Sequence, residues 1–280
     1  MNTVASLLQQ AEQTLQQNPA QADDAAIDAR LLLGHLLQKS SAWLATWPEQ
    51  TVTDTIAEQY QQLLAQRQIG TPTAYLLGEW DFMDFTLQVG PGVLVPRPDT
   101  ELLVELAAER IPTQANWQLL DLGTGTGAIA IALARLRPHC NAVAVEQSQT
   151  ALDIAQNNID KLAPTIQLHW GSWFEPIASS QQFEIIVSNP PYIGDQEPEL
   201  AQLTEEPLEA LVAANDGLAD LTNIIAGATQ HLKKAGWLLV EHGYKQGPAC
   251  RDLFNNAGYS DIETVNDLAG KPRVTLGRWA

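Results

Sequence analysis

"LLDLGTGTGAIAIALA", residues 119–134, decides the fold because a strand, a tight turn and a helix follow one another in it. The apolar start is typical of a buried strand, and the Ala- and Ile-rich end is typical of a buried helix. Glycines in such a turn permit positive φ angles, and the helix N-terminus favours an anionic group. The stretch therefore predicts a nucleotide-like cofactor, although Gly123, Gly125 and Ala128 also satisfy the G-x-G-x-x-G/A pattern of dinucleotide-binding proteins.

Two acids accompany the turn. Glu146 ends the next apolar run, "NAVAVE", at the spacing where an acid accepts hydrogen bonds from ribose hydroxyls. Asp121 lies inside the first strand, and a buried acid needs partners, either turn amides or a cofactor ammonium group. The candidate cofactor-binding residues are thus Asp121, Gly123, Thr124, Gly125, Thr126, Gly127 and Glu146.

Further along the chain, apolar strand patterns alternate with amphipathic helix patterns. We expect helices at 99–111, 127–136, 149–161, 218–234 and 246–257, and strands at 117–122, 141–146, 166–170, 183–188, 237–242 and 274–278. This alternation predicts an α/β fold, a parallel sheet with helices on both faces. Before it, residues 1–70 have three helical patterns, and the stretch from Ala74 alternates like short strands or a hairpin. We expect a helical domain at 1–70, a hairpin linker at 71–98 and a catalytic domain at 99–280.

"SNPPYIG", residues 188–194, follows the apolar run "FEIIV" at the edge of the sheet where ligands bind. Two consecutive prolines restrict the backbone and remove two N–H donors. The Asn189 side-chain oxygen and the Pro190 carbonyl can then accept both hydrogens of a planar NH₂ group, with the Tyr192 ring against it. An amide or aromatic amine held in this way is prepared for attack on an electrophilic sulfonium methyl group.

Taken together, "NPPY" and "DLGTGTG" resemble class I S-adenosylmethionine-dependent methyltransferases that modify planar nitrogens. The further segments "LVPRPDTELLVE", "YLLGEWDF", "GSWFEP", "EPLEAL", "VEHGYKQG" and "RVTLGR" narrow the resemblance to the peptide chain release factor N5-glutamine methyltransferase family. The resemblance covers about residues 70 to 280, and residues 1–70 share only the family's helical character.

The resemblance implies a Rossmann-like sheet, S-adenosylmethionine as cofactor, and a class 1 release factor as protein substrate, methylated on the glutamine of its Gly-Gly-Gln motif. It implies that the glycine turn holds the cofactor's methionine end, Glu146 the ribose and Trp173 the adenine. The target glutamine would be held by Asn189, Pro190, Pro191 and Tyr192, of which Asn189, Pro190 and Tyr192 are the candidate catalytic residues and Asn189 also faces the cofactor.

The sequence departs from the family at two positions. Many members carry Asp where this chain has Glu146, and many carry an acid where it has Ser172. A longer acid still reaches a ribose, so only the detailed geometry at Glu146 changes. For Arg97 and Glu101 in "PRPDTE" the sequence leaves two roles open, facing the cofactor pocket or forming a helix cap and ion pair.

Composition narrows the remaining alternatives. A formal net charge of −18 argues against tight binding to a nucleic-acid backbone. The tetrapeptide "NPPY" alone would also suit a methyltransferase that modifies exocyclic amines of nucleic acids. The negative charge disfavours this alternative. Cys140 and Cys250 lie far apart, and neither they nor His169 and His242 have partners at metal-ligand spacing, so we expect no metal site and a structural role for both histidines.

No membrane span or export signal is expected. We also expect a cytoplasmic enzyme that is a monomer and binds neither nucleic acid nor membrane. A NAD-dependent dehydrogenase, or a nucleotide-binding module without catalysis, remains the alternative from a different class.

Overall fold

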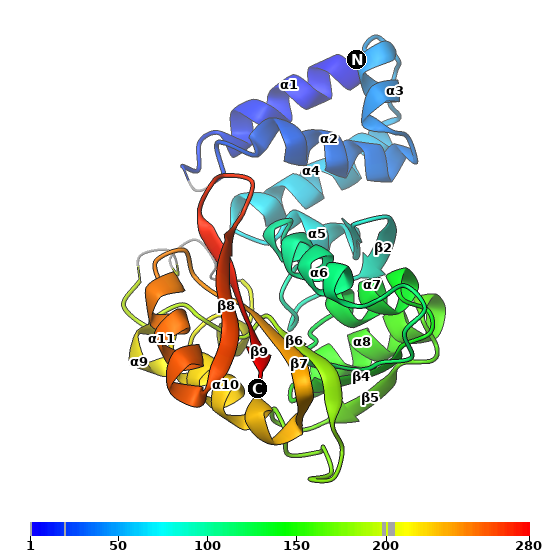
Figure 1. Cartoon of the computed structure of the whole chain (residues 1–280). Helices are drawn as coiled ribbons and strands as arrows, with labels where there is room; N and C mark the ends of the chain where they lie inside the picture. The colour runs from blue at the N-terminus through cyan, green and yellow to red at the C-terminus, as the bar shows by residue number, and fades with distance from the viewer. Residues whose placement is uncertain (1, 20, 198–199, 201–204) are drawn as a thin grey trace. The chain divides into compact units, whose positions relative to one another are not determined.

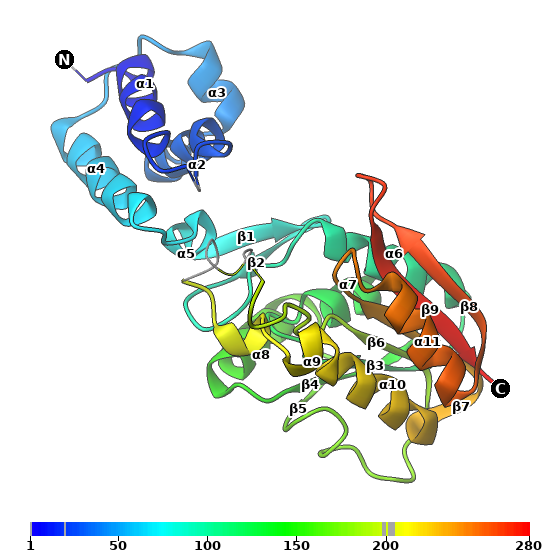
Figure 2. The ribbon, with the colours of Figure 1, turned by 90° about the vertical axis from the view of Figure 1, so that its left-hand side faces the viewer.

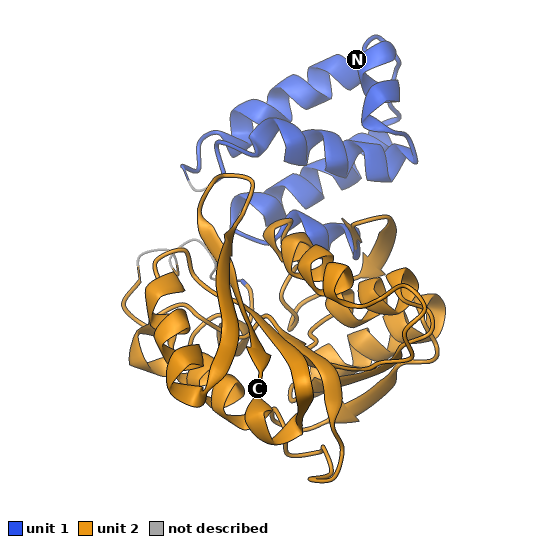
Figure 3. Cartoon of the chain, viewed as in Figure 1, with its two compact units in different colours: residues 1–79, 201–205 blue, residues 80–200, 206–280 orange. Residues whose placement is uncertain are grey.

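The computed structural model describes residues 2–19, 21–197, 200 and 205–280. The chain divides into two compact units (Figure 3): residues 1–79 with 201–205, and residues 80–200 with 206–280. Each unit has its own apolar core.

The first unit is helical. Its helices are α1 (Val4–Leu15), α2 (Ala25–Leu37), α3 (Ser41–Thr46), α4 (Asp54–Gln68) and α5 (Thr73–Leu77). Helices α1, α3 and α4 each begin at a capping residue whose side-chain hydroxyl accepts a backbone N–H of the first turn; these caps are Thr3, Ser40 and Thr53. The three helical patterns of the sequence correspond to α1, α2 and α4, whereas the six-residue α3 was not predicted.

Helix α5 corrects the expected linker. The sequence pattern from Ala74 onward predicted strands, but residues 73–77 form a helical turn between Pro72 and Gly78. Gly78 has a φ of 75° and ends the helix in the left-handed conformation that glycine adopts at little cost. The hairpin itself follows as β1 (Glu79–Phe82) and β2 (Phe85–Gln88).

The second unit is built on a seven-stranded sheet in the order β5-β4-β3-β6-β7-β9-β8. The strands are β3 (Gln118–Leu122), β4 (Asn141–Glu146), β5 (Gln167–Trp170), β6 (Phe183–Ser188), β7 (Leu232–Glu241), β8 (Tyr259–Asn266) and β9 (Pro272–Trp279). Strands β3 to β7 are parallel, as the alternation of strands and helices predicted. The sheet is thus an α/β sheet that is mostly, not wholly, parallel.

The far edge of the sheet differs from the sequence prediction. Strand β9 runs antiparallel to both β7 and β8, and β8 was not predicted at all. Its polar residues alternate with partly buried ones, because β8 lies at an open sheet edge where only one face is covered.

Helices cover both faces of this sheet (Figures 1 and 2). On one face lie α6 (Asp99–Arg110), α7 (Ala128–Leu136) and α8 (Gln149–Leu162), and on the other α10 (Ala219–His231) and α11 (Gly247–Ala257). The short elements η2 (Leu208–Ala210) and α9 (Ala214–Gly217) lie between β6 and α10 in the chain.

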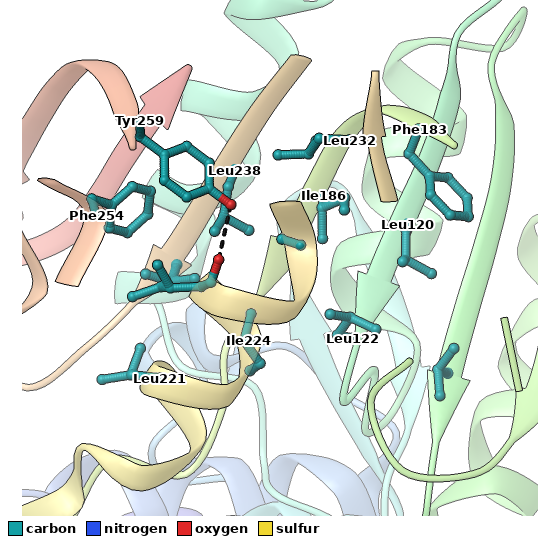
Figure 4. Close-up of a cluster of buried hydrophobic side chains, with 14 of the residues drawn as sticks. Leu120, Leu122, Phe183, Ile186, Leu221, Ile224, Leu232, Leu238, Phe254 and Tyr259 are labelled. Atoms are coloured by element: carbon teal, nitrogen blue, oxygen red, sulfur yellow. Dashed lines mark hydrogen bonds between the residues drawn. The ribbon is translucent and has the colours of Figure 1, made fainter. Parts of the chain in front are cut away.

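The core between the sheet and α10 is shown in Figure 4. Leu120 and Leu122 of β3 and Ile186 of β6 face Ile224 of α10, and all four are fully buried. The Tyr259 hydroxyl donates a hydrogen bond of 3.0 Å to the carbonyl of Ile225, which satisfies the phenol inside this apolar layer. The core thereby fixes the carboxyl ends of the parallel strands, where the candidate site lies.

Candidate active site

The glycine turn after β3 has the backbone that its sequence predicts. Gly123, Gly125 and Gly127 have φ angles of 69°, 58° and 85°. The N–H groups of Gly123 and Thr124 donate to the carbonyl of Val145 at 2.9 and 3.0 Å, which joins the turn to the end of β4. A Cβ atom at Gly123 would lie 3.2 Å from the Trp173 ring. Glycine is therefore required here both by conformation and by the closeness of Trp173.

The Glu146 carboxylate organises the turn from the end of β4. One oxygen accepts the Gly125 N–H at 2.9 Å, and the other accepts the N–H groups of Gln147 and Ser148, both at 2.8 Å. The side chain is buried, yet it lines the pocket beside the turn. Its oxygens thus lie where a ligand hydroxyl can reach them.

Asp121 lies beneath the turn. One carboxyl oxygen accepts from the Thr124 hydroxyl at 2.6 Å and from the Ala130 N–H at 3.2 Å. Burial raises the pKa of the Asp121 carboxyl to about 7. The other oxygen is buried with no hydrogen-bond partner among the described residues. The Thr124 hydroxyl of the turn and the Ala130 N–H of α7 thus hold one oxygen of Asp121, and its side chain does not line the pocket.

The Asn-Pro-Pro-Tyr segment follows β6 at the same edge of the sheet. The Asn189 side-chain nitrogen donates to the Thr100 hydroxyl at 3.1 Å. Tyr192 donates its hydroxyl to Glu241 at 3.3 Å, and its carbonyl accepts from the Gln246 side chain at 2.9 Å. Pro190 and Pro191 are both buried. The segment is therefore held through Asn189 and Tyr192 by the start of α6 and the end of β7.

One pocket brings these elements together. It is lined by the glycine turn, by Glu146, and by Trp173, Asn189 and Pro191. Trp173 has a φ of 46° and donates its indole N–H to Asp220. Most of the candidate site residues line this pocket. The exceptions are Asp121, Gly127, Pro190 and Tyr192.

The structure also shows the positions of the residues whose roles the sequence left open. Arg97 forms an ion pair with the buried Glu206, whose other oxygen accepts the Val95 N–H at 3.2 Å. Glu101 accepts the Met83 N–H at 2.9 Å. Neither Arg97 nor Glu101 lines the pocket; Arg97 forms an ion pair as the second alternative allowed, whereas Glu101 holds a backbone N–H outside its own helix instead of capping it.

Ser172 and the two histidines lie outside the pocket. The Ser172 N–H is near the Glu175 carboxylate at 3.4 Å. His242 is fully buried between the carbonyl of Gly243 and the hydroxyl of Thr275, and burial lowers its pKa. His169 lies in β5. Among the described residues there is no group of three or more His, Cys, Asp or Glu side chains that could hold a metal, and no helix is long and apolar enough to cross a membrane.

Two parts of the site were not predicted from the sequence. The pocket wall includes Gly92, Val93 and Leu94 before α6, and Pro207, Glu209 and Ala210 around η2. Glu241, which receives the Tyr192 hydroxyl, was also missed. It ends the apolar run "WLLVE", the same signal of an acid at the end of a core strand that identified Glu146.

Comparison with known proteins identifies the family. Residues 6–78 match the family described as PrmC N-terminal domain, and residues 98–259 match the methyltransferase small domain. The release factor glutamine methyltransferase of Vibrio cholerae is 44% identical over 99% of this chain and 97% of its own. That of Escherichia coli is 46% identical over 90% of this chain and 91% of its own. The chain belongs to the release factor glutamine methyltransferase family.

Structural comparison agrees on the fold. A 16S rRNA N2 G1207 methyltransferase of T. thermophilus, solved with AdoMet and guanosine, superposes with a TM-score of 0.56 and 21% identity, over 72% of this chain and 50% of its own. The family resemblance and the Rossmann-like class I methyltransferase fold that the sequence predicted are both confirmed. A dehydrogenase or a noncatalytic nucleotide-binding module is thereby excluded as the family of this chain.

Proposed function

We propose that the chain transfers a methyl group from S-adenosylmethionine to the side-chain amide nitrogen (N5) of the glutamine in the Gly-Gly-Gln motif of class 1 release factors. One observation carries the proposal: Asn189 and Pro191 line the same pocket as the glycine turn. A methyl donor bound by the turn would then lie beside the residues that hold a planar amide.

The residues present fit the cofactor. The glycine turn exposes backbone beside the N-terminus of α7, which suits the methionine end of the cofactor, and Glu146 offers carboxylate oxygens to the ribose hydroxyls. Trp173 gives the pocket an aromatic wall for adenine. When bound, the cofactor supplies the electrophilic methyl group on its sulfonium.

The chain's own contribution is to orient the nucleophile. The nitrogen of an amide is a weak nucleophile because its lone pair is delocalised. The Asn189 oxygen and the Pro190 carbonyl would accept its two hydrogens and direct the nitrogen toward the methyl group, while the Tyr192 ring limits its movement. No strong base is needed, since the methylated amide loses its proton readily to water.

The remaining parts of the proposal concern partners and organisation. The helical domain at 1–70 docks the release factor, the hairpin at 71–98 joins it to the catalytic domain at 99–280, and the enzyme works as a cytoplasmic monomer. The net charge of −18 favours a protein substrate over direct binding of nucleic acid.

Incubation with labelled S-adenosylmethionine and a purified class 1 release factor tests this function. Mass spectrometry of the tryptic digest should locate one methyl group on the glutamine of the Gly-Gly-Gln motif. A release factor with Ala in place of that glutamine is the control and should stay unlabelled. Label on both proteins, or on neither, would contradict the proposal.

A further inference from the structure

Behind the Asn-Pro-Pro-Tyr segment lies a buried acid that the proposed reaction does not use. Glu241, at the end of β7, is fully buried, and one of its carboxyl oxygens has no hydrogen-bond partner among the described residues. It accepts the Tyr192 hydroxyl at 3.3 Å and also bonds the Thr100 hydroxyl. Thr100 in turn accepts the Asn189 side-chain N–H at 3.1 Å. Glu241 therefore contacts both ends of the segment, directly at Tyr192 and through Thr100 at Asn189.

The chemistry of these groups gives the chain of hydrogen bonds a direction. Burial raises the pKa of the Glu241 carboxyl to about 7, so above this pH the carboxylate is ionised and can only accept, and the single hydroxyl hydrogen of Thr100 goes to Glu241. The Thr100 oxygen is then left with lone pairs alone for Asn189, and it can pair only with the NH₂ end of that carboxamide. The Asn189 oxygen consequently faces the other way, free to accept a hydrogen from a target amide.

We propose that Glu241 and Thr100 are positioning residues that fix which end of the Asn189 carboxamide faces the target, while Glu241 also holds the Tyr192 ring. This inference rests on the proposed function. A flipped Asn189 would present its NH₂ group to the NH₂ of the target glutamine, two donors that cannot bond. Both groups act through Asn189 and Tyr192; Thr100 also lines the pocket, whereas Glu241 does not.

The contacts around Glu241 support a role beyond packing. A glutamine of the same shape would fill the site without the cost of burying a carboxyl group, which is considerable when one oxygen lacks a partner. Within the described part of the chain, the cation that interacts with Glu241 is Arg273, which also pairs with Asp99 and Asp267. Glu241 thus occupies a site where stability alone favours a neutral side chain.

Thr100→Val tests the orientation, because valine has the shape of threonine without its hydroxyl. At saturating cofactor and release factor we expect kcat to fall about 10- to 100-fold, the effect of about 1.4–2.8 kcal/mol. Thr100→Ser, which restores the hydroxyl, should recover most of this loss. Glu241→Leu, which removes the acceptor oxygens, should lower kcat in the same range and leave the cofactor dissociation constant within about twofold, since Glu241 does not line the pocket.

A double-mutant cycle separates positioning from a general structural effect. In an Asn189→Ala background, Thr100→Val should change the single-turnover rate less than about twofold, because the group that it orients is gone. An equal loss in both backgrounds, or a wild-type kcat for Thr100→Val and Glu241→Leu, would overturn the inference. A wild-type enzyme that fails to methylate release factors would instead overturn the proposed function.

A measurement without turnover completes the test. In ¹⁵N-labelled protein, the Asn189 side-chain NH₂ signals are identified by their loss in Asn189→Ala. We expect them to exchange with water faster in Thr100→Val than in Thr100→Ser or the wild type. Identical exchange in all three proteins would show that Thr100 does not hold this carboxamide.

Discussion

Glu146 and Gly125 are joined by a hydrogen bond of 2.9 Å from the backbone N–H of the turn to the carboxylate at the end of β4. The acid that is proposed to bind the ribose thus also holds the loop that is proposed to bind the rest of the cofactor. Binding and loop geometry are coupled through one side chain. Removing the Glu146 side chain should weaken cofactor binding more than it lowers the stability of the fold.

Glu146→Ala should weaken S-adenosylmethionine binding by roughly 10- to 150-fold, because hydrogen bonds to a charged group contribute about 1.5–3 kcal/mol. Isothermal titration calorimetry measures the dissociation constant. Glu184→Ala is the matched control, since Glu184 also accepts a backbone N–H, that of Gln118 at 2.7 Å, but does not line the pocket. Equal dissociation constants for the two variants would show that Glu146 does not bind the cofactor.

The glycine turn could be predicted from sequence because its causes are local. Positive φ at Gly123, Gly125 and Gly127 requires glycine, and a strand and a helix lie immediately on either side. The Asn-Pro-Pro-Tyr segment is equally local, since two prolines fix its backbone. These two stretches indicated two walls of the pocket at the ligand-binding edge, while the sheet itself was predicted from the alternation of strand and helix patterns along the chain.

Other features depend on contacts between distant residues and could not be predicted. Strand β8 has a mixed polar pattern that becomes a strand only through pairing with β9. The pairing of Asn189 with Thr100 joins residues 89 positions apart, and that of Arg97 with Glu206 joins residues 109 apart. Nothing in a local pattern specifies which hydroxyl or acid lies opposite which side chain.

Asn189→Ala should depress kcat by about 10²–10³, the loss expected when one preorganised polar contact at a reacting centre is removed. Cofactor affinity should change much less, because the turn and Glu146 are untouched. Single-turnover methylation of a release factor at saturating cofactor measures the effect. If Asn189→Ala reacts at the wild-type rate while Tyr192→Ala is inactive, ring contact alone would position the glutamine.

The stability of the chain should respond to pH through Glu241. Burial raises the pKa of this carboxyl from 4.5 to about 7, so the folded state binds a proton that the unfolded state has lost between these values. The contribution to stability is complete below about pH 4.5 and is lost as pH rises through about 7. Thr100, Arg273, Asp99 and Tyr192 are the groups that interact with this carboxyl.

Glu241→Gln removes this titration. The free energy of unfolding of the variant, relative to wild type, should therefore rise between about pH 4.5 and 7 and become constant above about pH 8. Urea denaturation at a series of pH values across this range measures the difference. Asp121 titrates in the same direction and is present in both proteins, so it cancels. A difference that does not vary with pH would show that Glu241 has an ordinary pKa.

Gly217 is predicted to hold Tyr192 in place by having no side chain. It follows two residues with positive φ, Asn215 and Asp216, and has a φ of 80° itself. A Cβ atom there would lie 2.0 Å from the carbonyl oxygen of Tyr192, far inside contact distance, and 2.7 Å from the Gln246 nitrogen that bonds this carbonyl. Gly217→Ala must therefore displace the Tyr192 backbone.

Gly270→Ala provides the matched control, because Gly270 has a φ of 76° and a Cβ atom added there would meet no other atom within 4 Å. Both substitutions introduce the same strain of about 1–2 kcal/mol for a left-handed alanine. A difference in kcat or melting temperature between the two variants therefore reports the clash with Tyr192. We expect Gly270→Ala to keep the wild-type kcat. Gly217→Ala should lose about 10²-fold, as for a displacement of about 1 Å at a reacting centre, and should melt at a lower temperature than Gly270→Ala. Equal kcat values for the two folded variants would mean that the position of Tyr192 does not limit methyl transfer.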